Sequence, residues 1–266
     1  MKSLFAGFLA VIVLLTSCFC CFALPEDQSP VADTTAQVSM IGHKGYCAYY
    51  QENTTESFQK AAEAGFFGVE TDVRMTKDGV FVLSHGEEIE MADGTMMKVS
   101  RHTYRELVAQ PLKNEFTETT LYLCTLKEYF EICKENHLFC FIELKGYFPI
   151  FKILEAFSLA KECYDLQMCE FQSFELPVLL IAHIAFPDLR IMLTTNKYNF
   201  NAKAALFLGF DLDMNHENLT EEVVQKFHNK GRLVSCFTVN ERDEALRCAA
   251  CGVDFMETDC FSSLPV

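Results

Sequence analysis

Residues 210–260 read FDLDMNHENLTEEVVQKFHNKGRLVSCFTVNERDEALRCAACGVDFMETDC. Short apolar runs alternate in this stretch with segments of helical periodicity. Each helical segment ends at a glycine, Gly231 or Gly252, as helices commonly do. Strands that are separated by helices predict a parallel sheet. The predicted order is strand 210–215, helix 220–229, strand 233–239, helix 242–251 and strand 254–260.

The same alternation extends upstream to residue 38. Eight strand–helix units in about 230 residues predict a closed (β/α)8 barrel, the TIM barrel of the α/β class. A doubly wound open sheet is the runner-up, although no GxGxxG follows the first strand. The polar stretch 86–120 is less regular and is predicted to be an excursion from the main architecture. The upstream strands are predicted at 38–42, 67–73, 80–84, 138–145, 169–174 and 190–195, and the helices at 52–65, 126–136, 150–163, 176–185 and 202–208.

The N-terminus has the composition of a targeting segment. Lys2 precedes an apolar core at 4–17, and Ala23 provides a small residue before a cleavage point. Two alternatives stay open: a lipoprotein with a lipidated Cys18, or an uncleaved membrane anchor at 4–23. All three place the protein outside the cytoplasm, secreted or tethered to a membrane. The predicted division is a signal peptide or anchor at 1–23, a flexible linker at 24–37 and one domain at 38–266.

Net charge argues against nucleic-acid binding, and cysteine content argues against metal or redox chemistry at cysteine. The formal charge of −15 argues against binding nucleic acid, whose phosphates would be repelled. It does not exclude a small phosphate ester, because a bound divalent cation reverses the field within one pocket. Ten of the thirteen cysteines lie after the targeting segment, mostly within apolar strands or helices, where cysteine behaves as a small hydrophobe. The pair Cys248 and Cys251 has ligand spacing, but no second CxxC accompanies it.

Polar side chains gather at the carboxyl ends of the predicted strands, where barrel enzymes carry their catalytic groups. A charged group within an apolar strand is costly unless it has a partner, so these positions indicate a site. The leading candidates are His43, Lys44, Glu70, Asp72, His85, Glu143 and Lys145. Other polar residues at strand ends are Ser173, Asn215, Asn240, Glu257 and Asp259.

Three of these candidates have the character of metal ligands. Glu70 and Asp72 are two residues apart in VETDV, so their side chains share one face of the strand. Glu143 comes from the strand FIELK, with Lys145 on the same face. Three carboxylates without a matching cluster of histidine or cysteine suit a hard divalent cation, Ca²⁺ or Mg²⁺.

Two histidines complete the predicted site. His43 and His85 end separate strands, beside the metal and a lysine. This arrangement suggests acid–base chemistry on a phosphate ester, in which one histidine takes a proton from the nucleophile and the other protonates the leaving oxygen. The remaining histidines lie in the excursion, in helices or in loops, and only His216, at a strand end, is a further candidate for lining the pocket.

Several stretches together resemble the glycerophosphodiester phosphodiesterase family: IGHKG, ENTTESF, GVETDVRMTKDGVFVLSH, FIELK and LVSCFTVNERDEALRCAACGVDFMETD. They run from the first predicted strand to the last. The resemblance implies a (β/α)8 barrel with a small insertion after the second strand, which the excursion at 86–120 matches. It also implies metal-dependent hydrolysis of glycerophosphodiesters to glycerol 3-phosphate and an alcohol, in lipid and glycerol metabolism.

The resemblance implies a role for each candidate. His43 and His85 form the acid–base pair, and Lys44 and Lys145 contact the phosphate. The metal ligands are Glu70, Asp72 and Glu143. Glu52 lies near the first histidine and orders its loop, while Gly42 and Gly45 leave room for the phosphate.

The sequence departs from the family pattern at three positions. Lys44 stands where arginine is usual, Gly86 where aspartate is usual, and Phe237 where tryptophan is frequent. The first two lie beside the predicted chemistry and motivate a competing class, a non-catalytic exported protein that binds phosphodiesters. A third interpretation keeps the enzyme and changes its substrate to a lysophospholipid or a cell-wall polyol phosphate.

Overall fold

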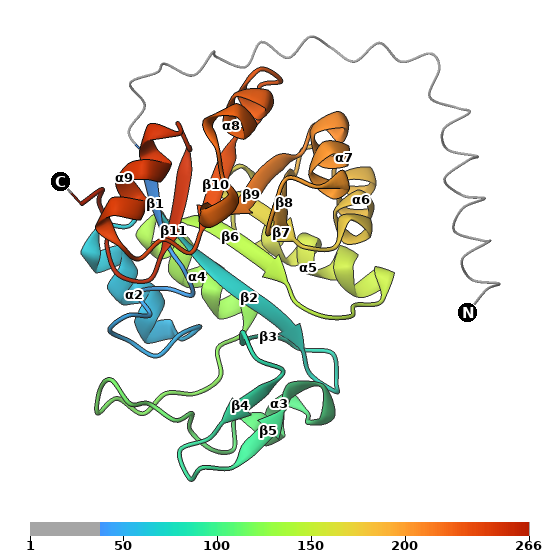
Figure 1. Cartoon of the computed structure of the whole chain (residues 1–266). Coiled ribbons are helices and arrows are strands. Elements are labelled where there is room, and N and C mark those ends of the chain that lie inside the picture. Colours follow the sequence, from blue (N-terminus) through green and yellow to red (C-terminus); the bar gives the residue numbers. More distant parts are fainter. Residues whose placement is uncertain (1–37, 266) are drawn as a thin grey trace. The chain divides into compact units, whose positions relative to one another are not determined.

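Eight parallel strands close into a barrel in the computed structural model, which describes residues 38–265 (Figure 1). Closure comes from β1, which pairs with both β2 and the last strand, β11. The (β/α)8 prediction is therefore confirmed. The predicted targeting segment 1–23 and linker 24–37 lie outside the described residues. In order around the barrel, the strands are β1 (Ser39–Gly42), β2 (Gly68–Met75), β6 (Phe139–Leu144), β7 (Cys169–Ser173), β8 (Arg190–Thr195), β9 (Asp211–Asn215), β10 (Val234–Phe237) and β11 (Phe255–Thr258).

Helices cover the outside of the barrel, and within residues 38–265 none follows β11. Local signals set their ends: Thr54 caps the first helix through a capping box with Ser57, and Gly65 ends it in a left-handed conformation. No helix in the described part of the chain combines the length and hydropathy needed to cross a bilayer. The covering helices are α2 (Thr55–Ala64), α4 (Leu126–Asn136), α5 (Ile150–Cys163), α6 (Leu176–Ala185), α7 (Phe200–Leu208), α8 (Glu221–His228) and α9 (Arg242–Ala250), and single 3-10 turns occur at η2 (Leu166–Met168) and η3 (His216–Asn218).

The segment between β2 and α4 forms the predicted insertion (Figure 1). Its first strand, β3 (Phe81–Leu83), extends the sheet by pairing antiparallel to β2 outside the barrel. The hairpin β4 (Glu88–Glu90) and β5 (Met96–Lys98) follows, and then η1 (Val99–Arg101) and the short helix α3 (Tyr104–Leu107). A small hydrophobic core of its own supports the insertion, made of Val82, Ile89, Met91, Val99, Leu107 and Leu123.

Side chains alternate between the two faces of each barrel strand. One set packs against the helices: Phe171 of β7 meets Phe157 of α5 edge-on, with ring centroids 4.4 Å apart. The other set fills the barrel and changes character along its axis. An apolar cluster lies toward the amino ends of the strands, since Phe139 and Phe255 begin β6 and β11, and polar side chains occupy the interior at the carboxyl ends. The apolar cluster contains Ile41, Phe139, Phe141, Met192 and Phe255.

We expect Phe171→Ala to lower the free energy of unfolding by about 3–5 kcal/mol, because it removes a fully packed ring and leaves a cavity. Phe207→Ala is the matched control: this ring, on α7, is 89% exposed, so its loss should change stability by less than about 0.5 kcal/mol. Urea unfolding followed by circular dichroism measures both. Equal effects of the two substitutions would contradict this assignment of the core.

Candidate active site

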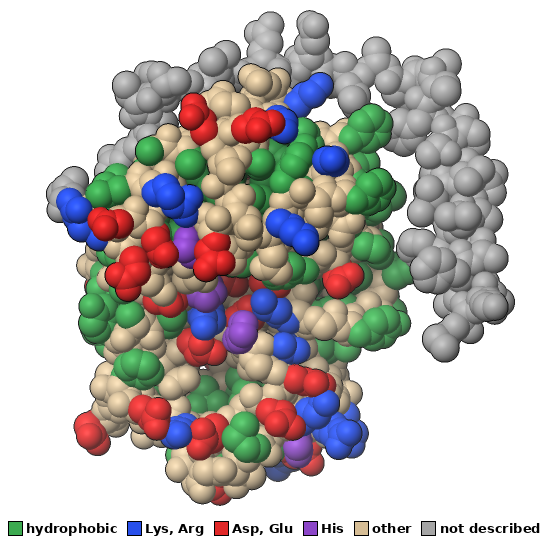
Figure 2. All heavy atoms as spheres, in the orientation of Figure 1, with side chains coloured by type: hydrophobic (Ala, Val, Ile, Leu, Met, Phe, Trp, Pro, Cys, Tyr) green, Lys and Arg blue, Asp and Glu red, His purple; other side chains and the backbone are tan. Residues whose placement is uncertain are grey.

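A cavity of about 230 Å³ opens at the carboxyl ends of the barrel strands. Figure 2 shows histidine and basic (Lys or Arg) side chains gathered near the centre of the molecular face, with acidic side chains around them. Five of the seven leading candidates from the sequence line this one cavity. Its lining comprises His43, Glu70, His85, Glu143, Lys145, Gln172, Phe174, Thr194, Asp213, Phe237, Thr238 and Glu257.

The three predicted metal ligands come together at one side of the cavity. Glu70 and Asp72 lie on β2, and Asp72 is in register with Glu143 of β6. One carboxylate oxygen from each lies within 4.8 Å of the others, and all three side chains are buried. A cluster of hard oxygen donors at this spacing can hold a divalent cation.

Burial controls the protonation of this cluster. It raises the pKa of Glu70 well above the usual range and that of Glu143 to about 7. Asp72 differs: burial opposes its ionisation, but the Lys145 ammonium and the Asn53 amide together lower its pKa. Lys145 Nζ lies 2.7 Å from Glu143 Oε2 and 3.2 Å from Asp72 Oδ1. One ammonium therefore partly compensates three carboxylates.

Asn53, absent from the sequence prediction, fixes the orientation of Asp72. Its Nδ2 donates to Asp72 Oδ2 at 3.0 Å, and its Oδ1 accepts from the Thr71 hydroxyl at 2.8 Å and from the Asp72 backbone at 3.2 Å. The next residue, Thr54, caps α2. The motif Glu-Asn-Thr thus joins the start of the first helix to a metal-ligand candidate on the second strand. The asparagine of this motif, directly before the N-cap threonine, was the feature of the sequence that could have predicted this role.

His43 belongs to a partly exposed chain of polar groups. Its Nδ1 lies 2.7 Å from Asp259 Oδ1, while Asn240 and the Cys47 thiol also donate to this carboxylate, at 2.6 and 2.9 Å. Burial opposes ionisation of Asp259, yet these hydrogen bonds from His43, Cys47 and Asn240 hold its pKa well below the usual range. An anionic partner at Nδ1 favours the tautomer with a proton there and leaves Nε2 as the free base.

His85 approaches the cavity from the segment after β3. Arg74 holds its backbone, because the guanidinium donates to the His85 carbonyl at 2.6 and 3.1 Å. Burial lowers the pKa of the His85 imidazole. His216 does not line the cavity: its carbonyl accepts from Arg247 of α9 at 2.7 Å.

Lys44 and Glu52 pair with each other. The Lys44 ammonium contacts the Glu52 carboxylate, while the Lys44 backbone, at a left-handed φ of 57°, donates to Glu70 Oε2 at 3.0 Å. Glu52 therefore orders the loop through Lys44 and not through His43. The two glycines of this loop serve close packing, because a Cβ on Gly42 would lie 2.9 Å from the Gly45 carbonyl oxygen. The space beside Gly42 is filled by the loop itself, and that beside Gly45 is filled by Ser57 of α2.

The remaining polar lining forms a cluster on the other side of the cavity, from β7 to β11. Of these side chains, only Glu257 stood among the strand-end residues picked from the sequence. The others lie inside strands that are apolar on both faces, so the alternation of polar and apolar side chains cannot be recognised in their sequences. We call this group the floor cluster; it consists of the lining residues Gln172, Thr194, Asp213 and Glu257 and of the buried Ser235, which is in register with Asp213.

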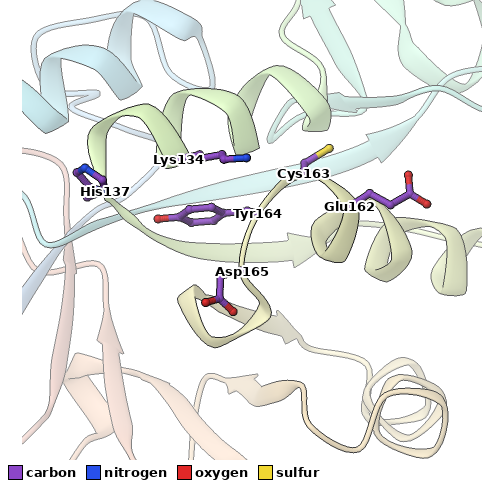
Figure 3. A pocket seen from close by; sticks show the side chains of 6 residues that line it. All are labelled: Lys134, His137, Glu162, Cys163, Tyr164 and Asp165. Atoms are coloured by element: carbon purple, nitrogen blue, oxygen red, sulfur yellow. The ribbon is translucent and has the colours of Figure 1, made fainter.

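A second hollow, of about 320 Å³, lies at the carboxyl ends of α4 and α5 (Figure 3). These helix ends precede β6 and β7, so the hollow belongs to the opposite end of the barrel. Figure 3 shows the side chains of Lys134, Glu162 and Asp165 spread apart around the Tyr164 ring. The Tyr164 hydroxyl donates to the Leu138 carbonyl at 3.1 Å. These groups do not converge on a common point.

Comparison with known proteins agrees with this geometry. The sequence profile of the glycerophosphoryl diester phosphodiesterase family matches residues 43–261. The chain belongs to this family. A glycerophosphodiester phosphodiesterase of Bacillus altitudinis is 26% identical over 231 residues, which cover 83% of this chain and 94% of the relative. Glycerophosphodiester phosphodiesterase 1 of Mus musculus is 32% identical over 117 residues, 42% of this chain and 35% of that protein.

Solved structures show the same fold. A glycerophosphodiester phosphodiesterase from Thermotoga maritima superposes with a TM-score of 0.67 at 28% identity, covering 84% of this chain and 94% of that one. A phosphodiesterase from Oleispira antarctica, in complex with the product sn-glycerol-3-phosphate, gives a TM-score of 0.76 at 20% identity, covering 84% and 93%. The protein is therefore an enzyme, a phosphoric diester hydrolase of the glycerophosphodiester phosphodiesterase type.

We expect Asp259→Asn to lower kcat on the order of 10²–10⁴-fold with little change in KM, because an amide no longer favours the required tautomer of His43. Steady-state kinetics over a range of pH measures this. Asp243→Asn, at a fully solvated position of α9, is the control and should retain the native rate. A KM effect without a kcat effect would contradict the positioning role.

Proposed function

We propose that the enzyme uses a divalent cation to hydrolyse glycerophosphodiesters to glycerol 3-phosphate and an alcohol, within lipid and glycerol metabolism. The observation that carries this proposal is the convergence of three buried carboxylates with two histidines in one cavity. The product complex of the Oleispira antarctica phosphodiesterase supports the nature of the substrate.

The residues of the cavity fit a hard cation. Glu70, Asp72 and Glu143 offer carboxylate oxygens within 4.8 Å of one another, which suits Ca²⁺ or Mg²⁺. Lys145 offsets part of their charge. A cation bound there would act as a Lewis acid toward a phosphoryl oxygen.

The two histidines divide the proton transfers. His43 Nε2 accepts the proton of the glycerol 2-hydroxyl as that oxygen attacks phosphorus. His85 gives its proton to the alcohol oxygen as the bond from phosphorus to that oxygen breaks. Water then opens the resulting cyclic ester with the two roles reversed, which restores both protonation states. Because the nucleophile belongs to the substrate, proximity supplies much of the rate.

Lys145 and Lys44 are the proposed phosphate contacts, and they differ in whether their charge is available. Lys145 lines the cavity, and its ammonium lies 5.6 Å from the centre of the Phe174 ring. Burial favours the neutral amine of Lys145, but Glu143 and Asp72 outweigh it and raise its pKa, so the group stays charged. Lys44 is paired with Glu52 and would reach the phosphate only by leaving that partner.

An exposed aromatic rim beside the cavity favours lipid-bearing diesters as a second class of substrate. Tyr147 and Phe151 follow β6 and Phe200 follows β8, and their side chains are 66–86% exposed. Phe174 and Phe237 line the cavity itself and pack against each other. Such a surface can hold the acyl chain of a lysophospholipid.

The proposed location is extracytoplasmic, secreted or tethered by the N-terminus, and it rests on the sequence of residues 1–23.

Metal removal tests the proposal directly. Release of glycerol 3-phosphate from glycerophosphocholine should stop in EDTA and return with Ca²⁺ or Mg²⁺. Because the cation must displace protons from Glu70 and Glu143, its dissociation constant should fall at least about tenfold between pH 6 and pH 8. The folded-state pKa of Glu143 exceeds that of the unfolded chain, so the metal-free protein should lose stability as the pH rises towards 7.

Isothermal titration calorimetry at the two pH values measures the affinity, and thermal unfolding of the metal-free protein measures the stability. Glu143→Gln is the matched control, in which both pH dependences should weaken. Full activity after exhaustive chelation would contradict the proposed metal dependence.

Replacing either His43 or His85 with alanine should lower turnover by several orders of magnitude. Replacing both should cost little more than replacing one, because the pair acts as a unit. Ca²⁺ binding should survive in all three variants, since the carboxylates of β2 and β6 remain. Near-native turnover by His85→Ala would show that the acid lies elsewhere at the barrel mouth.

A comparison of lysophosphatidylcholine with glycerophosphocholine tests the aromatic rim. We expect Tyr147→Ser and Phe151→Ser to lower kcat/KM for the lipid several-fold and to leave the soluble diester unaffected. Phe207→Ser is the control, because this exposed ring lies near the other end of α7. An equal loss on both substrates would contradict a chain-binding role.

A further inference from the structure

Three different donor groups meet where the loop after β1 contacts the end of β11. They are the His43 imidazole, the Cys47 thiol and the Asp259 carboxylate, and one ligand atom from each lies within 4.8 Å of the others. His43 Nδ1 and Cys47 Sγ both contact Asp259 Oδ1, at 2.7 and 2.9 Å. The sequence alone gave Cys47 no chemical role, since its carboxylate partner lies 212 positions away. The proposed hydrolysis gives this thiol no role either.

The backbone holds these donors in place. The His43 N–H donates to the Thr258 carbonyl at 2.9 Å, and the Ala48 N–H donates to the Asp259 carbonyl at 3.0 Å. Both ends of the segment 43–48 are thus attached to the end of β11. Two residues in the left-handed conformation turn the chain between them. Donors that are already positioned lower the cost of binding a ligand.

The donor set has the character of a zinc site. Zn²⁺ binds imidazole, thiolate and carboxylate, whereas Ca²⁺ and Mg²⁺ prefer oxygen ligands. A thiolate and a carboxylate together bring two negative charges, so a divalent ion is neutralised by its own ligands. The side chains of His43 and Asp259 are 20% and 26% exposed, which leaves the group accessible to an ion and to water as a fourth ligand. The site therefore differs in chemical class from the three carboxylates of β2 and β6.

We propose that His43, Cys47 and Asp259 bind Zn²⁺ and that this ion inhibits the enzyme. The inhibition rests on the proposed role of His43 as the base, whereas the binding does not.

Coordination changes the protons that these groups carry. In the metal-free protein the Cys47 thiol keeps its proton, which it donates to Asp259, and burial raises the pKa of this thiol. A thiol that coordinates a metal loses its proton, so one proton is released to solvent for each ion bound. With Zn²⁺ on Nδ1, the neutral imidazole of His43 carries its proton on Nε2 instead. That nitrogen then cannot accept the proton of the attacking hydroxyl.

Co²⁺ serves as a spectroscopic probe for the proposed zinc site. The full-length protein is titrated with Co²⁺ at pH 7.5, in excess Ca²⁺ and with a phosphine reductant. One equivalent should produce a thiolate-to-cobalt charge-transfer absorption in the near ultraviolet, and one equivalent of Zn²⁺ should remove it. Cys47→Ser and Cys47→Ala should lack the absorption. Cys163→Ser is the matched control, because this partly exposed thiol lies at the other end of the barrel, and it should retain the absorption.

Inhibition by Zn²⁺ is measured in saturating Ca²⁺, with each variant compared with its own rate before zinc is added. We expect Cys47→Ser to raise the half-inhibitory zinc concentration at least about tenfold, because it removes a ligand, and Cys163→Ser to leave it unchanged. An absorption that survives in both Cys47 variants, or that is missing from the native protein, would overturn the zinc site. Equal inhibition of native protein and Cys47→Ser would overturn the inhibitory role. Loss of hydrolysis under all metal conditions would overturn the proposed function, while the cobalt spectrum would still test the site.

Discussion

The buried carboxylate of Asp72 connects the parts of this active site. It receives a hydrogen bond from Asn53 of the loop before α2, faces Glu143 on the neighbouring strand and pairs with the Lys145 ammonium. A buried acid is stable only with such partners, so the positions of these groups depend on one another. The loop that carries His43 is held in turn through Lys44, whose backbone donates to Glu70. The candidate metal ligands, His43 and Lys145 therefore form one connected structure.

The two ends of the barrel differ in whether their buried acids have a cationic partner. Toward the amino end, Glu170 and Asp211 share Arg190, with oxygen–nitrogen distances of 2.8 and 3.5 Å. Each of these acids therefore has a cation of the protein beside it, although Glu170 Oε1 receives no hydrogen bond from the described residues. At the mouth, Asp213 and Glu257 have no cation of their own among the described side chains. This excess of acceptors marks the mouth as the end that binds ligands.

The three departures from the family pattern differ in how they change the site. Lys44 keeps a positive charge at its position but commits it to Glu52. Gly86 is packed so closely that a Cβ would lie 2.9 Å from the Glu88 carbonyl oxygen, so an aspartate there requires the backbone to shift. Phe237 lines the cavity and packs edge-on against Phe174, with centroids 6.0 Å apart. It keeps an aromatic wall without an indole N–H.

The sequence by itself determined the barrel and half of its site. Alternating strands and helices specify local structure, and parallel strands between helices leave few ways to close a sheet. Glu70 and Asp72 were visible because a two-residue spacing puts them on one face, and His43 because it ends a strand. Only the tertiary structure decided the rest. Asn53 acts through a contact with Asp72, 19 positions away, and Asp259, visible as a strand-end acid, has its partner His43 216 positions away. Asp213 faces the cavity because of the register between β8, β9 and β10. Such pairings depend on how the barrel closes, which no local pattern encodes.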